Sequence, residues 1–264
     1  MNMDRKKIDT YAKAWVKEAG ERLKKSFSEE LTIETKSNRN DLVTNLDKEI
    51  ELFFRHKIAE TFSDHKVVGE EAMEANYSNV SGVVWIIDPI DGTMNFVHQQ
   101  RNFAISIGIY EDGVGQIGLI YDVIHDELYH AIKGEGAFMN EQRLPMLEEV
   151  EVSDMILSIN ATWIGENNRI DPSILTPLVR DVRGTRSYGS AAIELAYVAA
   201  GRTDAYMTMR LAPWDFAGGV VLLQEVGGEV TTMDNQPLDF VNGSSLFASK
   251  PGLHKQINET YLGK

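Results

Sequence analysis

The feature that most constrains the fold is a short apolar run that ends abruptly in acids. Residues 83–87 read Val-Val-Trp-Ile-Ile, with Gly82 before them and Asp88-Pro89 after them. So short a run, rich in β-branched residues, is typical of a buried strand rather than of a helix. We therefore expect a core strand that ends at Asp88.

Periodic apolar residues elsewhere predict the other elements. Apolar residues recur at helical spacing over 8–23, and again over 46–62 behind Thr44, a suitable N-cap. The alternating pattern of 103–138, broken by turn signals, predicts an antiparallel meander. Further predicted strands are 156–159, 204–209 and 229–233, and further predicted helices start near 173, cover 190–200 and 215–225, and lie near 254.

Helices and strands that alternate in this way predict an α/β fold of the α+β or layered kind, with mixed sheets. The 264 residues correspond to roughly 1.8 domains at about 150 residues each. No internal repeat or long linker separates two parts of the chain. We expect one large unit or two closely packed ones.

The charge balance and the lack of cysteine exclude several classes of protein. Acidic residues number 40 and Lys plus Arg 26, and the resulting charge of −14 disfavours binding to nucleic acid or anionic lipid. Without Cys there is no disulfide, thiolate metal site or Cys nucleophile. No apolar run is long enough to span a membrane, and no signal segment is evident. We expect a cytoplasmic protein with no membrane partner.

The acids after the predicted core strand indicate a cation site. Two carboxylates about 4 Å apart repel by about 4 kcal/mol at an effective dielectric constant near 20, so Asp88 and Asp91 need a proton or a cation between them. The Ile90 carbonyl and the Thr93 hydroxyl would complete a set of oxygen ligands. Such a set is typical of Mg²⁺ rather than of zinc or copper.

Other acids have structural interpretations as well. Asp215 stands where an acid favours the start of a helix, and Asp47 stands where it would support the Thr44 cap. Glu70 and Glu71 form a pair of a kind that is usually solvated. Each interpretation stays open beside a functional one.

Three competing motifs do not apply to this sequence: one has the wrong context, one is absent and one has the wrong spacing. The glycines 113, 115 and 118 spell G-x-G-x-x-G, but they lie in a predicted hairpin with no helix behind them. No P-loop sequence is present. The aspartyl-phosphate pattern D-x-D-x-T needs acids two apart, whereas Asp88 and Asp91 are three apart.

A set of segments along the chain forms a recognisable signature. They are 69–71 (GEE), 85–96 (WIIDPIDGTMNF) and 213–218 (PWDFAG), with 41–47 (DLVTNLD), 133–138 (KGEGAF), 186–192 (RSYGSAA) and 201–206 (GRTDAY). In these motifs and in their order the sequence resembles the inositol monophosphatase family, the Mg²⁺-dependent, lithium-sensitive phosphomonoesterases. The resemblance covers nearly the whole chain.

The resemblance implies an αβαβα layered sandwich, usually a homodimer. It implies a single unit over 1–264, which we divide into an N-terminal lobe of about 1–150 and a C-terminal lobe of about 151–264. It also implies two or three Mg²⁺ ions. The first would bind Glu70, Asp88 and the Ile90 carbonyl, the second Asp88, Asp91 and Asp215, and a weaker third would lie near Glu70.

For catalysis the resemblance implies hydrolysis by a metal-activated water. Thr93, held by Asp47, and Glu70 would orient this water. The substrate would contact the backbone near Gly92 and Thr93. The other substrate-binding residues implied by the resemblance are Asp91, Gly189, Ser190, Thr208, Arg210 and Asp215.

The sequence departs from the family pattern at one informative position. Inositol-specific members carry an acid seven residues before the last metal aspartate, where this chain has Thr208. Arg210 and Arg186 could pair with a second phosphate if they face the site, or could be ordinary surface residues. We expect an inositol monophosphate phosphatase. The alternatives are a more anionic substrate, either fructose 1,6-bisphosphate or the 2′-phosphate of NADP, and a non-catalytic role in transcription or RNA-processing complexes.

Overall fold

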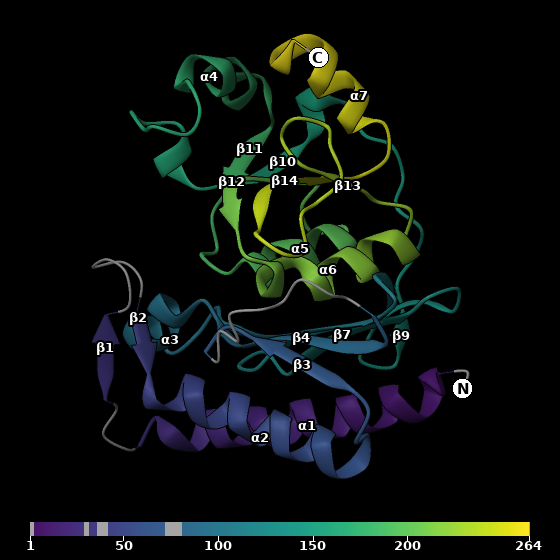
Figure 1. Ribbon diagram of the computed structural model, residues 1–264. Coiled ribbons are helices and arrows are strands. Elements are labelled where there is room, and N and C mark those ends of the chain that lie inside the picture. The colour runs from purple at the N-terminus through teal and green to yellow at the C-terminus, as the bar shows by residue number, and fades with distance from the viewer. Residues whose placement is uncertain (1–2, 29–31, 36–41, 72–80, 264) are drawn as a thin grey trace.

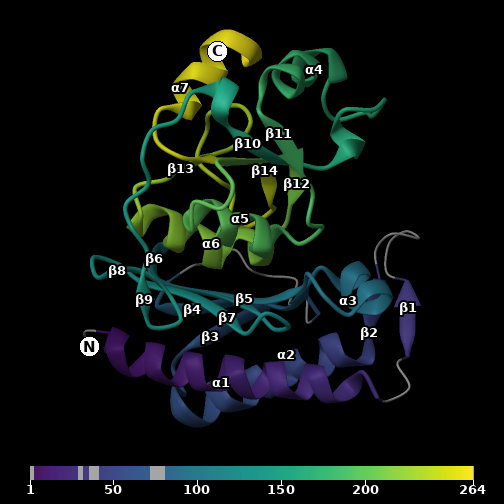
Figure 2. The same cartoon turned by 180° about the vertical axis from the view of Figure 1, so that it is seen from behind.

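A seven-stranded and a five-stranded sheet alternate with layers of helices. The computed structural model describes residues 3–28, 32–35, 42–71 and 81–263. Their helices are α1 (Arg5–Ser26), α2 (Asn45–Thr61), α3 (Thr93–Gln99), α4 (Pro172–Asp181), α5 (Ala191–Ala199), α6 (Pro213–Glu225) and α7 (Leu253–Ile257). Figures 1 and 2 show α1 and α2 under the larger sheet, α5 and α6 between the sheets, and α4 and α7 beyond the smaller one. The layered αβαβα prediction is confirmed.

The outer helices α1 and α2 form as their periodicity predicts. Thr44 is the N-cap of α2, with its hydroxyl accepting the Leu46 N–H at 3.2 Å and its own N–H donating to Asp47 at 2.7 Å. The apolar stripes of both helices pack on one face of the larger sheet, where Trp15 lies against Trp85. Among the described residues, no helix is both long and apolar enough to cross a membrane.

The larger sheet contains the predicted strand and the predicted meander. Strand β3 runs parallel to β4, and every other neighbouring pair is antiparallel. In sheet order its strands are β3 (Lys66–Gly69), β4 (Val83–Asp91), β5 (Ala104–Glu111), β6 (Val114–Asp122), β7 (Glu127–Ile132), β8 (Gly136–Met139) and β9 (Gln142–Arg143).

The middle helix α6 packs directly on the backbone of β5 and β6. A Cβ at Gly218 would lie 2.9 Å from the Ile107 and Leu119 carbonyl oxygens, and one at Gly118 would lie 2.3 Å from the Gly218 oxygen. Only glycine allows so close an approach. Gly118, one of the glycines of the G-x-G-x-x-G sequence, therefore allows α6 to pack closely on β6. These glycines lie in the antiparallel hairpin of β5 and β6, as the sequence predicts.

The smaller sheet is mixed. One of its faces packs on α5 and α6, and the other packs on an apolar cluster that includes residues of α4 and α7. Strands β10, β11 and β12 are parallel, and β14 runs antiparallel to both of its neighbours. In sheet order the strands are β11 (Gly184–Arg186), β10 (Ile156–Ile159), β12 (Ala205–Leu211), β14 (Ser244–Ser249) and β13 (Glu229–Thr231). Short helical turns η1 (Val152–Asp154), η2 (Ala161–Trp163) and η3 (Asn258–Leu262) complete this part of the chain.

Several elements differ from the sequence-based expectation. Strand β4 does not end at Asp88 but continues to Asp91, because a bulge keeps the chain paired with β5. Helix α3 and strands β3, β11 and β14 were not predicted, because their runs are too short to show a period. A small hairpin of β1 (Ile33–Thr35) and β2 (Leu42–Thr44) was not predicted either. Asp41, in the segment 41–47, lies outside the described residues.

Candidate active site

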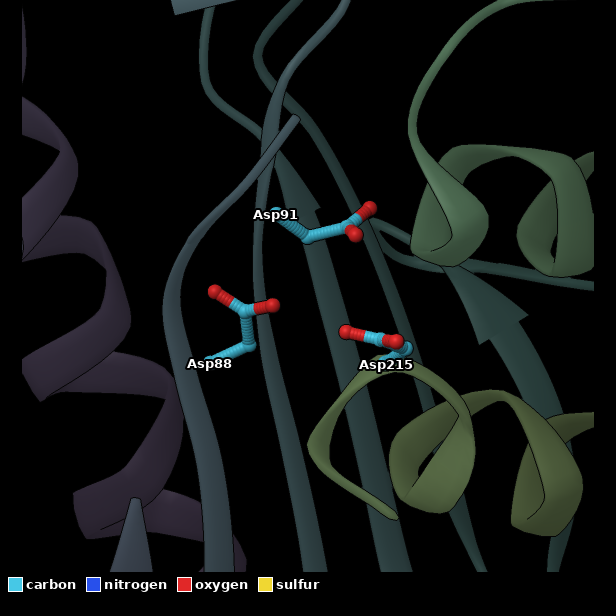
Figure 3. A group of neighbouring side chains, drawn as sticks. All are labelled: Asp88, Asp91 and Asp215. Carbon is cyan, nitrogen blue, oxygen red and sulfur yellow. The ribbon is translucent and has the colours of Figure 1, made fainter. Parts of the chain in front are cut away.

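Three aspartates from distant parts of the sequence meet between the larger sheet and α6. Each of Asp88, Asp91 and Asp215 offers one carboxylate oxygen, and these oxygens all lie within 4.8 Å of one another. Figure 3 shows the Asp215 carboxylate, at the start of α6, directed toward the two aspartates of β4. The convergence predicted from the sequence is thus present.

A β-bulge makes Asp88 and Asp91 face the same side. Asp88 pairs with Ser106 and Asp91 with Ala104, so three steps along β4 match two steps along β5. In a regular strand, residues three apart point to opposite faces. The extra residue shifts the alternation by one, so that Asp88 and Asp91 share a face. Ile90 packs on the side of α1 and α2, whereas Asp91 faces α5.

Asp215 both stabilises the start of α6 and lies in the aspartate cluster. It stands in the first turn of α6, and its carboxylate accepts the Ala212 N–H at 2.8 Å. With this bond in place, the Asp215 carboxylate still points toward Asp88 and Asp91. Capping and membership of the cluster are therefore compatible.

The electrostatics of the cluster favour a bound cation. Burial, followed by the neighbouring carboxylates of Glu70 and Asp91, holds the pKa of Asp88 well above its usual range. Burial and Asp91 do the same for the pKa of Asp215. Burial raises the pKa of Asp91 to about 6, against hydrogen bonds from Ser190 and Ala192 that lower it.

No arginine or lysine within the described ranges forms an ion pair with these three aspartates. Buried like charges without a partner are costly, and a divalent cation removes that cost. The donors are all oxygens, which fits Mg²⁺. The residues present thus suit the metal that the sequence predicts.

Thr93 and Asp47 meet beside this cluster, as the resemblance implies. The Thr93 hydroxyl lies 3.2 Å from a carboxylate oxygen of Asp47 and 3.0 Å from the Ile90 carbonyl oxygen. The other Asp47 oxygen accepts from the N–H and the hydroxyl of Thr44. Asp47 therefore completes the cap of α2 and also contacts Thr93 at the start of α3.

Glu70 approaches the cluster from the end of β3. Its charge raises the pKa of Asp88, Asp91 and Asp215, which places it within electrostatic reach of all three. The Glu71 N–H donates to the carboxylate of the buried Glu51 at 2.7 Å, so the pair is not simply solvated.

Glu51 was not predicted as a residue of the site. It stands four residues after Asp47, hence on the same face of α2, and is 1% exposed. Two acids at this spacing within a stripe that includes Ile50 and Phe54 are a signal that could have found it. Its carboxylate also pairs with Arg55 at 2.8 Å.

The predicted substrate residues divide into two groups. Gly92, Gly189 and Ser190 lie together: a Cβ at Gly92 would be 3.2 Å from the Ser190 Cβ and 3.3 Å from the Gly189 oxygen. Ser190 donates its hydroxyl to Asp91, and the Ala192 N–H donates to the same oxygen at 2.8 Å.

The second group lies on and beside β12. Thr208 is buried, on the same face of the strand as Tyr206. Burial raises the pKa of Tyr206, and the carboxylates of Glu194, Asp91 and Asp215 raise it further. Arg210 and Arg186 are exposed, and Arg186 donates to the main-chain oxygen of the neighbouring Thr185 at 2.8 Å. The structure thus gives neither arginine a contact with the aspartates.

Comparison with known proteins identifies the family. The inositol monophosphatase family model matches residues 4–262. The inositol-1-monophosphatase of Bacillus subtilis is 64% identical over 97% of this chain and 96% of its own length. A crystal structure of SaIMPase-II with inositol monophosphate bound is 42% identical, with a TM-score of 0.87 over 97% of this chain and 93% of that chain.

A second solved structure, an IMPase/NADP phosphatase complexed with Mg²⁺ and phosphate, is 29% identical. Its TM-score is 0.90, with 97% of this chain and 95% of that chain covered. The order of the motifs, the converging aspartates and these likenesses agree over almost the whole length. The chain belongs to the inositol monophosphatase family.

Proposed function

We propose that the protein is a Mg²⁺-dependent phosphomonoesterase that hydrolyses inositol monophosphate to inositol and phosphate. The observation that carries the proposal is the convergence of Asp88, Asp91 and Asp215, without a basic partner in the described ranges, in a chain of this family. The inositol-1-monophosphatase at 64% identity supports the choice of substrate.

The ligand sets are those that the family resemblance implies, and the grouping of Asp88, Asp91 and Asp215 supports them. Glu70, Asp88 and the Ile90 carbonyl would hold one Mg²⁺, and Asp88, Asp91 and Asp215 a second. A third ion would lie near Glu70. Bound Mg²⁺ would lower the pKa of a water and offset negative charge that develops on the ester oxygens.

The protein's own residues would orient the reactants. Asp47 accepts hydrogen bonds from Thr44, so its remaining oxygen is held toward Thr93. Thr93 and Glu70 would then fix the position of the attacking water and take part in moving its proton. The main-chain N–H groups of Gly92 and Thr93 would hold phosphate oxygens, next to Asp91 and Asp215.

Gly189, Ser190 and Thr208 would contact the alcohol part of the substrate. The exposed Arg210 would extend the site toward a second anionic group, as in fructose 1,6-bisphosphate or NADP. The NADP phosphatase activity named for the 29% identical structure favours NADP as the second candidate.

Other properties stay predictions. These are the homodimer, lithium sensitivity, the cytoplasmic location and the absence of nucleic-acid and membrane partners. A non-catalytic role in transcription or RNA-processing complexes also stays an alternative. An Asp88→Asn strain with an intact phenotype, under conditions where a deletion strain fails, would favour that role.

Phosphate release from a substrate panel tests the proposal. We expect hydrolysis of inositol monophosphate that needs Mg²⁺ and stops with a chelator, and no activity in Asp88→Asn. Fructose 1,6-bisphosphate and NADP should be poorer substrates. No Mg²⁺-dependent release from inositol monophosphate would refute the proposal, and a preference for NADP would establish the alternative.

A further inference from the structure

The segment Tyr188-Gly189-Ser190 forms a rim beside the aspartate cluster. Its Ser190 hydroxyl donates to Asp91, and the segment lies so close to Gly92 that a Cβ there would be 3.2 Å from the Ser190 Cβ and 3.3 Å from the Gly189 oxygen. Gly189 is exposed, with φ of +79°, whereas Asp88 and Asp91 are buried. Within the rim, Gly189 is therefore nearer to solvent than the carboxylates that would bind Mg²⁺, whereas Ser190 is buried beside them.

Asn95 ties this rim to α3. Its side chain is 6% exposed, and its amide nitrogen donates to the main-chain oxygens of Tyr188 and Asn102, both at 2.7 Å. Gln99 donates to its amide oxygen at 3.0 Å. Because main-chain carbonyls only accept, the amide has one orientation that satisfies all three partners.

Glu194 holds the same residue from the opposite side. It lies on α5, is 3% exposed, and accepts the Tyr188 N–H at 2.7 Å. The N–H and the C=O of Tyr188 are thus both bound by buried side chains, one from each of two elements that are about a hundred residues apart in sequence. Neither side chain belongs to the proposed ligand sets.

We propose that Asn95 and Glu194 are positioning residues that clamp Tyr188 and thereby fix the rim against which the alcohol part of the substrate lies. The inference rests on the proposed function, which puts the phosphate on the buried carboxylates. The alcohol then extends outward and meets Gly189 and Ser190. Loosening the clamp should impair binding of a large polyhydroxylated alcohol more than the chemistry at phosphorus.

Two variants and two phosphate esters test the clamp. Asn95→Ala removes both donors, and Glu194→Leu removes the acceptor while keeping bulk. We expect each to raise KM for inositol monophosphate by about fivefold or more, the effect of losing a buried hydrogen bond of about 1 kcal/mol. The value of kcat/KM for p-nitrophenyl phosphate, which lacks ring hydroxyls, should change by less than about twofold.

Conservative and double variants separate positioning from general damage. Glu194→Gln should restore KM, because an amide oxygen still accepts the Tyr188 N–H. The double variant Asn95→Ala with Glu194→Leu should raise KM by less than the product of the single effects, because both act on one residue. Thermal unfolding checks that each variant is folded.

The controls are an asparagine and a glutamate whose hydrogen bonds go to other main-chain groups. Asn167 donates to the Gly165 oxygen at 3.0 Å and accepts the Arg169 N–H at 2.9 Å. Glu225 accepts the N–H groups of Gly134 and Gly136, both at 2.8 Å. Asn167→Ala and Glu225→Leu should leave KM unchanged.

The outcomes distinguish the inference from the proposed function. Equal losses on both esters, unchanged kinetics in the clamp variants, or the same KM rise in the controls would overturn the inference alone. Wild-type protein that hydrolyses p-nitrophenyl phosphate but not inositol monophosphate would overturn the proposed function, and the inference with it.

Discussion

The buried carboxylate of Glu51 lies where a side chain at Gly69 would have to be. A Cβ on Gly69 would stand 2.3 Å from the Glu51 carboxyl carbon. Because the same carboxylate accepts the Glu71 N–H, the glycine and the buried acid together set where Glu70 leaves β3.

We expect Gly69→Ala to weaken Mg²⁺ activation, because the new methyl group must displace Glu51 and with it the Glu70–Glu71 segment. The Mg²⁺ concentration for half-maximal phosphate release should rise by about tenfold, which corresponds to about 1.4 kcal/mol. Gly165→Ala is the control, since a Cβ there would be 3.8 Å from its nearest neighbour. Unchanged Mg²⁺ activation in Gly69→Ala would contradict this role of the glycine.

Removal of the Thr93 hydroxyl should lower kcat without unfolding the protein. Thr93→Val keeps the shape but ends the contact with Asp47, and we expect a loss of about 10²-fold in kcat, as for other groups that orient a proton transfer. Thr93→Ser should recover most of the rate. Steady-state kinetics at saturating Mg²⁺ provide the measurement, and a Val variant as fast as Ser would refute the role.

Asp47→Asn should affect stability as well as rate. Its carboxylate accepts the Thr44 N–H in the cap of α2, and weakening a cap costs about 1 kcal/mol. We expect a lower midpoint in urea unfolding together with lower kcat. Thr93→Val should lower kcat without a comparable fall in the urea midpoint. If Thr93→Val lost stability and Asp47→Asn lost only rate, the two roles would be misassigned.

The stability of the metal-free protein should fall as pH rises from about 4 to above 6. The raised pKa values of Asp88, Asp91 and Asp215 mean that the folded protein binds more protons than the unfolded chain in this range. Unfolding free energy then decreases with pH, by about 3 kcal/mol for Asp91 alone if its pKa moves from 3.8 to about 6.

Mg²⁺ should reverse this trend, because it offsets the ionised carboxylates. We expect the gain in Tm on adding Mg²⁺ to be larger at pH 8 than at pH 5, measured in the presence and absence of a chelator. Asp88→Asn removes one of the repelling charges, so its metal-free form should be more stable than wild type at pH 8 although inactive. An equal Mg²⁺ effect at both pH values would contradict the linkage.

Arg210→Ala tests the more anionic substrates. If the exposed guanidinium meets a second anionic group, kcat/KM for NADP or fructose 1,6-bisphosphate should fall by about fivefold while that for inositol monophosphate stays within about twofold. Arg169→Ala, another exposed arginine, is the control. Equal losses of kcat/KM on all three substrates would rule out a specific contact between Arg210 and a second anionic group.

Much of the fold could be predicted because its signals are local. The stripe of α1, the Thr44 cap of α2 and the alternation of the meander are properties of neighbouring residues. Short elements such as α3 and β14 were not predicted, because a few residues show no period and long-range pairing decides their form.

The candidate site divides in the same way. The sequence indicated that Asp88 and Asp91 need a cation, and the resemblance added Asp215. Nothing local indicated Asn95 or Glu194, because their roles depend on which backbone groups they meet across the fold. Glu51 has a local signal in its spacing from Asp47 along α2, but its contact with the Glu71 N–H is decided by the fold.

The sequence by itself determined that an apolar strand ends in acids, that a helix begins near Asp215, and that the chain has the family's order of motifs. The tertiary structure alone decided that Asp88 and Asp91 share a face, through a bulge, and that Ser190 reaches Asp91 from 99 residues away. The physical reason is that side-chain periodicity is written into adjacent residues, whereas strand register and contacts between layers arise only when the whole core packs.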